Sequence, residues 1–514
     1  MGGIREYVQD KQKQVVFFSA TAIALYGYDQ GMMSLINTNK NYLATMQIPE
    51  ESPIVGVIVS VYYLGCAVGA VIFSYMADKY GRKPALSACL ATASVGNLIM
   101  FIAGLGFSKG AREVMLLGRI VMGLGVGGVD SVVPVYSSEL SEDESRGKAL
   151  AQEFQSNIFG LNMAFAINLG ITISLGKYNE WAWRVPIIFM QIYPLLLFSF
   201  IGNLPESPRW LAFHDRKDDA SESLTDIFGS EEAKSRLDEL LESSKSEGES
   251  VSYTDMLTPG HAQFHPTIIT IMGQVNQALT GYGAVSVYGP QIFELLGYSV
   301  RTSEYLTQGN YISYFLLMTF AWLLIDVVGR RAVLLWGSAA LTAGFLLLTL
   351  FGGLATHADD LGISQMAVAI PGIITLFAAT GAFGIGWLAT IWLIPTEIYP
   401  TTARAQGTAV SVIVWGIANF AVTLATPIMF NNLSFWLFLV FGGTNLFAGA
   451  WTHFYCPESG GRSFEENQEF FDKAKEAGTW RVDKVEKGRY RKMPVGEDEE
   501  RRPLLERVGE QATS

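Results

Sequence analysis

The sequence predicts an all-α membrane protein with twelve transmembrane helices in two pseudo-symmetric bundles of six, and a short helical insertion between the bundles. Three observations predict this class. Half of the 514 residues are hydrophobic and only 16% are charged, a composition typical of membrane proteins. Apolar runs long enough to cross about 30 Å of hydrocarbon recur along the chain. Short charged motifs also recur, in the same order, in the two halves of the chain.

Twelve apolar runs give the predicted spans. Many Gly and Ala residues lie in them, which allows helices to pack closely in lipid. The first run follows a short polar segment and is too long for the core of a signal peptide, so we expect it to stay in the mature protein. The runs lie near residues 15–36, 53–76, 84–106, 114–136, 149–172, 183–204, 266–293, 305–325, 332–355, 366–394, 405–428 and 433–455.

The motifs that follow the spans indicate a duplicated half. A segment that begins with Asp and ends with basic residues occurs at 78–83 and again at 326–331. In a membrane protein, two repeated halves are typical of a transporter whose site lies at their interface. The other repeated elements are a Glu followed by an Arg at the same spacing, at Glu139 and Arg146 and at Glu397 and Arg404, and the sequence Pro-Glu-Ser at 205–207 and 457–459.

Basic residues predict the orientation of the chain. The short loops on one side carry Lys79, Arg82 and Lys83, and then Arg330 and Arg331. Because such loops face the cytoplasm, we expect a multi-pass protein of the plasma membrane with both termini cytosolic. The tail beyond about residue 475 is charged and lacks apolar periodicity, so its distal part is predicted to be disordered. The predicted parts are an N-terminal bundle at 1–204, cytosolic linker helices at 205–265, a C-terminal bundle at 266–456 and a cytosolic tail at 457–514.

Few residues suit a metal, a cofactor or a modification. Cys66, Cys89 and Cys456 fall in or beside apolar runs, as small buried hydrophobic residues do. The five histidines are scattered, and no nucleophile lies near a candidate base. The sequence therefore predicts no metal site, no cofactor, no enzymatic activity and no nucleic-acid partner. Asn432 begins a glycosylation sequon on the predicted outer side, but the short predicted loop disfavours its use.

These motifs together resemble the sugar porter family of the major facilitator superfamily, over about residues 15–470. The resemblance implies the major facilitator fold and transport of a small sugar-like substrate by alternating access. The form of the first-span motif and the pair Trp387 and Trp392 look most like fungal members. The motifs that carry the resemblance are Gly27-Tyr28-Asp29-Gln30-Gly31, residues 78–83, residues 118–127, Glu139 with Arg146-Gly147, residues 205–210 and residues 457–462.

The resemblance also implies a cytosolic gate, in which ion pairs between the halves form when the inner side is closed and break when it opens. The alternative is a set of tight turns, in which glycine permits the turn and basic residues fix the topology. The candidate gate residues are Asp78, Arg82, Glu139, Arg146, Asp326, Arg330, Glu397 and Arg404.

Two ionisable residues within spans are candidates for proton coupling. Asp29 and Arg119 each lie about 8–10 Å below the outer surface by helical rise, so they can meet. In proton-coupled members of the family, an Asp and an Arg at these positions form the protonation pair; a static pair that fixes helix packing is the alternative. Asp130 and Glu153 are further candidates for a proton site, although a satisfied polar contact is the favoured interpretation of Glu153.

The substrate positions match the family only in part. Gln277 and Trp392 are retained, with Trp387 nearby, whereas Phe154, Ala278, Gly283, Tyr314 and Trp415 stand where the family has amides. We therefore expect a less polar pocket, which puts a simple hexose in doubt and leaves a pentose, a polyol and a uronate open. Ala389 replaces a family proline, so the bend of the tenth span is expected to depend on glycines. The candidate substrate-binding residues are Gln277, Trp392, Trp387, Gln155, Tyr282, Tyr288, Tyr314 and Asn419.

The favoured function is proton-coupled symport of a sugar or sugar-like polyhydroxylated solute. A facilitative uniporter, a sugar acid or polyol transporter and a nutrient sensor that does not transport are the alternatives, and the short tail disfavours a sensor. The expected partners are the small-molecule substrate, protons and the lipid bilayer, and we expect a monomer.

Overall fold

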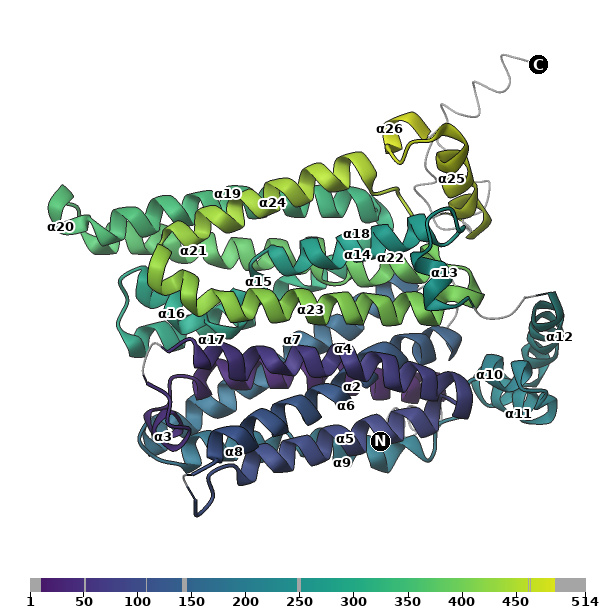
Figure 1. The fold of residues 1–514 in the computed structure, drawn as a ribbon, viewed down its shortest axis with the longest axis horizontal. Coiled ribbons are helices and arrows are strands. Elements are labelled where there is room, and N and C mark those ends of the chain that lie inside the picture. Colours follow the sequence, from purple (N-terminus) through teal and green to yellow (C-terminus); the bar gives the residue numbers. More distant parts are fainter. Residues whose placement is uncertain are drawn as a thin grey trace.

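The computed structural model describes residues 11–49, 52–107, 109–140, 146–246, 251–460, 462 and 464–485. Long helices run side by side in two bundles (Figure 1). One bundle contains the first half of the chain, from purple to blue, and the other contains the second half, from teal to yellow. The predicted all-α fold class is confirmed.

The N-terminal bundle covers the first six predicted spans. Its close helix contacts depend on glycine: a Cβ at Gly27 would lie 1.8 Å from the Asn157 carbonyl oxygen, and one at Gly160 would lie 2.0 Å from that of Ala24. The helices of the first and fifth spans therefore pack backbone against backbone. The elements are α2 (Lys11–Ile36), the short α3 (Lys40–Thr45), α4 (Ile54–Tyr80), α5 (Arg82–Ile102), α6 (Ala111–Leu140), α7 (Arg146–Leu175), α8 (Trp181–Phe189) and α9 (Ile192–Ile201).

The C-terminal bundle covers the other six predicted spans, and three of them are interrupted; the eighth is divided at Met318, between α17 and α18. The seventh is divided after α14, where Gly281 has a positive φ of 83°, and the tenth contains a single π-helical turn, η2. The elements are α14 (Phe264–Leu279), α15 (Tyr282–Val287), α16 (Gly289–Leu295), α17 (Val300–Leu317), α18 (Thr319–Val328), α19 (Arg330–Thr356), α20 (Ala358–Leu361), α21 (Gln365–Phe383), η2 (Gly384–Leu388), α22 (Thr390–Ile398), α23 (Thr401–Leu433) and α24 (Trp436–Tyr455).

A π-helical turn interrupts the tenth span directly before Ala389, which stands where the family has a proline. A π turn widens the helix by one residue and leaves backbone carbonyls without their usual partners. Gly386 within it also packs closely on α19, because a Cβ there would lie 2.7 Å from the Cα of Gly337. Gly384 and Gly386, two of the glycines in this span, therefore lie within the π turn, and the bend itself stays a prediction.

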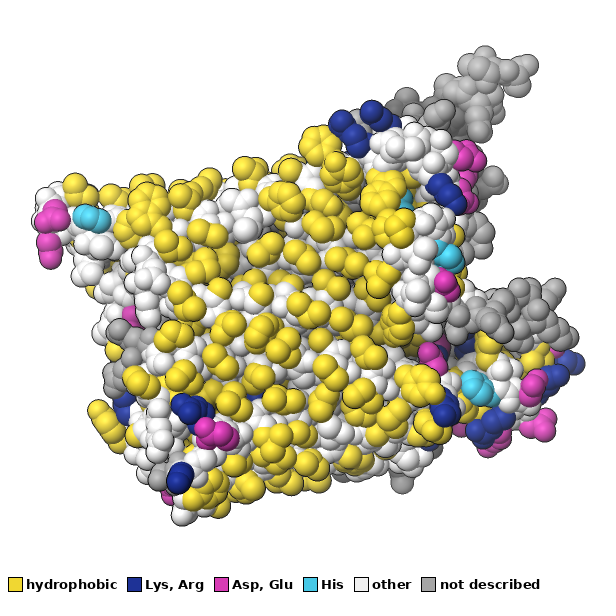
Figure 2. Space-filling model, viewed as in Figure 1, with side chains coloured by type: hydrophobic (Ala, Val, Ile, Leu, Met, Phe, Trp, Pro, Cys, Tyr) yellow, Lys and Arg dark blue, Asp and Glu magenta, His cyan; other side chains and the backbone are white. Residues whose placement is uncertain are grey.

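Among the described residues, nine helical segments are long and apolar enough to cross a membrane. The remaining predicted spans coincide with α2, the broken helix α14–α16, and α24. On the face in Figure 2, hydrophobic side chains cover the molecule between its two ends, and charged side chains gather toward the ends. Exposed Leu, Val and Ile side chains over such a band suit contact with lipid rather than water. The chain is an integral multi-pass membrane protein.

The insertion between the bundles forms short helices at the same end of the molecule as the last helices (Figure 1). We call this the proximal end, and the opposite end, with α3, α16 and α20, the distal end. Most of the predicted disordered tail lies outside the described residues, but 475–485 differs from that prediction, because Val482 and Val485 of α26 are buried. The elements at the proximal end are α10 (Pro208–Phe213), α11 (Lys217–Phe228), α12 (Ser230–Ser246), α13 (Tyr253–Leu257), α25 (Phe464–Ala477) and α26 (Val482–Val485).

The two bundles meet along two seams, α4 against α23 and α7 against α17 and α18. In the first seam, a Cβ at Gly416 would lie 2.6 Å from the Tyr63 carbonyl oxygen. In the second, the Asn162 amide donates to the Tyr311 carbonyl at 2.8 Å and accepts from Gln308 at 3.0 Å. The seams leave the space between α2, α7 and the interrupted helices for a site.

Candidate substrate and proton sites

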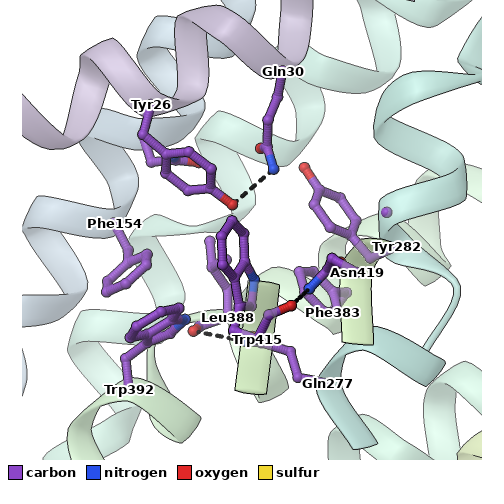
Figure 3. A pocket seen from close by; sticks show the side chains of 12 residues that line it. Tyr26, Gln30, Phe154, Gln277, Tyr282, Phe383, Leu388, Trp392, Trp415 and Asn419 are labelled. Carbon is purple, nitrogen blue, oxygen red and sulfur yellow. Dashed lines mark hydrogen bonds between the residues drawn. The ribbon is translucent and has the colours of Figure 1, made fainter. Parts of the chain in front are cut away.

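A pocket lies between the two halves, where the interrupted helices of the C-terminal bundle face α2 and α7 (Figure 3). Its walls come from both bundles, as a site at a repeat interface requires. The lining residues are Tyr26, Gln30, Phe154, Asn157, Gln277, Tyr282, Gly283, Phe383, Leu388, Trp392, Trp415 and Asn419.

Three aromatic rings form a continuous corner of this pocket. The ring of Phe154 on α7 lies 5.7 Å from that of Trp392 on α22, and Trp392 lies 6.0 Å from Trp415 on α23. On the other side, Tyr282 stacks on Phe383 at 4.1 Å. Aromatic faces suit the apolar C–H surfaces of a ring-shaped ligand.

Two amides are fixed by backbone carbonyls. Gln277 donates through Nε2 to the carbonyls of Trp387 and Leu388, at 3.1 and 3.2 Å, within the π turn and at its end. Asn419 donates through Nδ2 to the Trp415 carbonyl at 2.9 Å. In the described part of the chain no donor is placed on Gln277 Oε1 or Asn419 Oδ1. The two oxygens are therefore available to accept hydrogen bonds from ligand hydroxyls.

Four of the eight predicted substrate residues line the pocket: Gln277, Tyr282, Trp392 and Asn419. Trp387, Tyr288, Tyr314 and Gln155 do not. Trp387 is fully buried and donates to Ser338 at 3.1 Å.

Tyr288 and Tyr314 have packing positions behind the wall. Tyr288 donates to the Thr423 carbonyl at 3.3 Å. Tyr314 packs its ring 5.1 Å from that of Tyr282 and lies against Gly384. Tyr314 therefore supports a lining residue rather than contributing to the surface itself.

Gln155 lies in the seam between the bundles. Its Nε2 donates to the Phe315 carbonyl at 3.1 Å and to Thr319 at 3.0 Å, and its Oε1 accepts from Trp322 at 2.9 Å. With both ends of the amide in use, Gln155 joins the two halves and has little left for a ligand.

Several lining residues were not among the predicted set. Asn157 follows Phe154 by three residues, so helical spacing places both on one face of α7. Tyr26 and Gln30 have the i, i+4 relation on α2, and Gln30 donates to the Tyr26 hydroxyl at 2.7 Å. Helical spacing can therefore predict that Asn157, Tyr26 and Gln30 line the pocket. It cannot predict the positions of Phe383 and Leu388, because these depend on the π turn. Phe154, Gly283 and Trp415 were noted as lost amides, and they are themselves lining residues.

The coupling candidates form a buried ion pair in the N-terminal bundle. Arg119 Nη1 on α6 lies 2.5 Å from Asp29 Oδ1 on α2, and both side chains are almost fully buried. The guanidinium also donates to the carbonyls of Ile58 and Val59, at 3.3 and 3.2 Å, and lies 4.6 Å from the ring of Tyr62. Such a pair is well satisfied while Asp29 is ionised.

The other two buried acids differ from each other. Glu153 accepts a hydrogen bond from Ser137 at 2.6 Å, in line with the interpretation as a polar contact. Asp130 on α6 is buried, and within the described residues its Oδ1 has no hydrogen-bond partner.

Among the described gate candidates, Arg82 and Arg330 form ion pairs with acids of their own half. Arg82 lies 2.9 Å from Glu139 and 3.1 Å from Asp78, all in the N-terminal bundle. In the C-terminal bundle, Arg330 lies 2.6 Å from Glu397 and 2.9 Å from Asp326. Each of these arginines begins a helix directly after a glycine turn, and this places it beside acids of its own half. The expected contact across the halves, which would form when the inner side is closed, stays a prediction. Arg404 is partly buried in the first turn of α23, and the Arg146 side chain lies outside the described residues.

The glutamates of the two Pro-Glu-Ser repeats cap the helices that follow the glycine turns, α5 and α19. Glu206 accepts from the backbone N–H groups of Arg82 and Lys83, at 3.0 and 3.1 Å. Glu458 does the same for Arg330 and Arg331, at 2.8 and 3.1 Å. A carboxylate at a helix N-terminus satisfies free N–H groups and complements the helix dipole.

The carboxyl group of Glu458 has a shifted pKa. Burial raises the pKa of Glu458, against the lowering effect of the N–H donors around it. The sequence repeat was visible, but its capping role was not predicted.

The fold and the two-sided pocket define a transporter of the major facilitator type, not an enzyme. The family model described as "Sugar (and other) transporter" matches residues 15–471. The chain belongs to this family.

Individual relatives with similar sequences are also named as transporters. The chain is 29% identical to the MFS-type transporter oryC of Aspergillus oryzae, over 88% of this chain and 84% of the relative. It is 28% identical to the sugar transporter STL1 of Saccharomyces cerevisiae, over 91% and 83%. Among solved structures, the proton:xylose symporter XylE of E. coli, bound to 6-bromo-6-deoxy-D-glucose, superposes with a TM-score of 0.75 at 22% identity, covering 90% of this chain and 99% of XylE.

Proposed function

We propose that this protein is a proton-coupled symporter that imports a sugar-like polyhydroxylated solute by alternating access. In this proposal it is a monomer in the plasma membrane, and the proximal end with both termini faces the cytosol. The proposal rests on one observation: Asp29, paired with Arg119, is directly followed in α2 by Gln30, which lines the pocket. The naming of XylE as a proton:xylose symporter supports it.

The buried pair provides a simple route to coupling. When Asp29 is ionised, Arg119 holds it. A proton on Asp29 removes its charge, weakens the contact with Arg119 and frees α2 to move relative to α6. Because Gln30 moves with Asp29, protonation and pocket shape change together. One proton falling through about 150 mV releases roughly 3.5 kcal/mol, enough for a gradient of a few hundredfold.

The decisive experiment uses the full chain in proteoliposomes with an imposed proton gradient. Candidate solutes are pentoses, hexoses, polyols and sugar acids. We expect accumulation of the transported solute that collapses when a protonophore is added. Asp29→Asn should abolish accumulation while solute exchange at equal concentrations persists. Glu113→Gln, at an exposed acid of the same bundle, is the control and should accumulate normally.

A facilitative uniporter is the second reading of the same site, since a static Asp29–Arg119 pair would also be buried and satisfied. Uptake that equilibrates without accumulating, and that does not depend on the proton gradient, would establish it and reject coupling. Binding with no flux of any solute would instead indicate a sensor.

A further inference from the structure

The last described helix, α26, packs against the proximal end of α24, beside side chains that face lipid. Val482 and Val485 of α26 are buried, and this short helix contacts α24. On α24, Val440, Phe447 and Phe454 recur every seven residues, which places them on one face of the helix, and all three are exposed. Phe454 is therefore the proximal end of a stripe of apolar side chains that faces lipid.

Basic side chains gather at this border between the hydrophobic band and the proximal surface. The Arg481 guanidinium lies over the Phe454 ring, 5.0 Å from its centre, within the range of a cation–π contact. Arg331, the second residue of α19, donates to the His453 carbonyl at 2.6 Å, and Lys484 of α26 is exposed. In Figure 2, Lys and Arg side chains lie where Figure 1 places α26, next to hydrophobic side chains of the band. Cations at this level are positioned for the phosphate groups of a bilayer.

Aromatic side chains flank the same basic group. Tyr455 follows Phe454 in α24, and Trp480 directly precedes Arg481; both Tyr455 and Trp480 are exposed. Trp480 also stacks on the ring of His265 at the start of α14, at 4.5 Å, which fixes this segment to the bundle. Trp and Tyr are enriched where the membrane meets water, because each combines an apolar ring with a polar group. The flanking rings thus support a position at the membrane surface.

The sequence around α26 is basic although the protein as a whole is acidic. The formal net charge of the chain is −12, whereas residues 479–492 contain six basic and two acidic residues. Of this stretch, 486–492 lie outside the described part of the chain. Four to eight basic residues directly beyond a span are typical of segments that bind anionic phospholipids. The alternative is that they only fix the topology or satisfy carbonyls at the end of α24, as Arg331 does. The position of Arg481 over a lipid-facing ring favours lipid binding.

We propose that α26 and the end of α24 form a site for the headgroup of an anionic phospholipid. The phosphate binds Arg481 and Lys484, and the acyl chains follow the lipid-facing stripe that ends at Phe454. This site is separate from the substrate pocket and does not depend on proton coupling. It accords with the orientation proposed above, since anionic lipids are found in the cytoplasmic leaflet.

A lipid-binding assay on the purified full-length protein in a neutral detergent tests this proposal. The probes are fluorescent phosphatidylserine and phosphatidylcholine that carries the same label. We expect phosphatidylserine to bind at least about tenfold more tightly at low salt, because each basic residue near the headgroup contributes about fivefold. The preference should shrink at high salt, because exposed charges are screened. Equal dissociation constants for the two lipids at low salt would overturn the proposal.

A pair of double variants locates the site. Arg481→Gln combined with Lys484→Gln should weaken phosphatidylserine binding about twenty-fivefold and leave phosphatidylcholine binding unchanged. The matched control is Lys217→Gln combined with Lys234→Gln, at exposed lysines of α11 and α12, which extend away from the bundles at the same end (Figure 1). This control should bind phosphatidylserine as the wild type does. Equal weakening in both double variants, or none in the first, would refute the assignment to α26.

Two further measurements keep the test decisive. Lys484→Gln alone, at an exposed side chain, should weaken phosphatidylserine binding about fivefold, and it replaces the double variant if that variant does not fold. Inorganic phosphate separates a lipid from a free anion: displacement of the lipid by millimolar phosphate would mean that the site recognises an isolated anion and would reject the membrane assignment. Uptake assays are not involved, so failure of the proposed symport leaves this inference standing, and the reverse is also true.

Discussion

Asp29 and Asp130 are both carboxyl side chains buried inside spans, but their surroundings differ. Asp29 has the guanidinium of Arg119 at 2.5 Å, whereas Asp130 Oδ1 has no hydrogen-bond partner among the described residues. A buried polar atom without a partner costs about 1–3 kcal/mol. The two residues therefore contribute in opposite directions to the stability of the same bundle.

We expect Asp130→Asn to stabilise the protein by about 1 kcal/mol at neutral pH, because an amide cannot ionise, whereas a buried carboxyl group must either carry its charge or be held protonated. Thermal unfolding of the purified protein, followed by intrinsic fluorescence, measures the change. Asp29→Asn is the contrasting variant and should lower the unfolding temperature, because it leaves Arg119 buried and unpaired. An Asp130→Asn protein that is less stable and has lost accumulation would instead make Asp130 a second proton site.

At the residue scale, the sequence was most informative about charged residues within the spans, because few residues of this kind occur there. An Asp and an Arg inside spans are few enough to be matched by depth alone, and they do meet. The substrate side chains were harder to predict, because helix phase decides what faces the pocket. Gln155 follows Phe154 by one residue, which is about 100° around a helix, and so it faces the seam while Phe154 faces the pocket.

At the scale of elements, the spans follow directly from the lengths of apolar runs. Their interruptions do not. The break after α14 depends on a positive φ at Gly281, and the π turn depends on the packing of Gly386 against Gly337. Such features arise from contacts between segments distant in sequence, so periodicity within one run cannot predict them.

The two glutamate caps give a prediction at this scale. Each of Glu206→Ala and Glu458→Ala should destabilise the protein by about 1–2 kcal/mol, because each removes a charged acceptor from a helix N-terminus. Unfolding temperatures of the two variants should fall by similar amounts, since the two sites are equivalent in the two halves. Glu222→Ala, at an exposed acid of α11, is the control. Equal stability of Glu206→Ala and wild type would mean that the cap contributes nothing.

At the scale of the whole molecule, an ion pair joins the halves at the distal end. Lys177, between α7 and α8, lies 2.6 Å from Glu304 on α17, and Arg301 lies 3.1 Å from the other oxygen of the same buried carboxylate. Among the gate candidates, the described ion pairs lie within single halves. The Lys177–Glu304 pair at the distal end is therefore a contact between the halves, of the kind that alternating access must break when that end opens.

Lys177→Gln should weaken closure of the distal end. Hydrogen–deuterium exchange, read by mass spectrometry, should increase in the loop around Lys177 and in α16, with no change in α18 at the proximal end. Lys217→Gln, at an exposed lysine of α11, should have no such effect. Unchanged exchange in Lys177→Gln would show that seam packing, and not this pair, holds the distal end closed.

The glutamate caps also bear on how the chain is put together. Glu206 and Glu458 each lie downstream of the helix that they cap but inside the same repeat. Each half therefore supplies its own capping carboxylate. Each repeat is in this respect a self-sufficient module. We therefore expect the covalent join between α12 and α13 to be dispensable for assembly. Two polypeptides made separately and divided at that join should associate in the bilayer and form the same molecule.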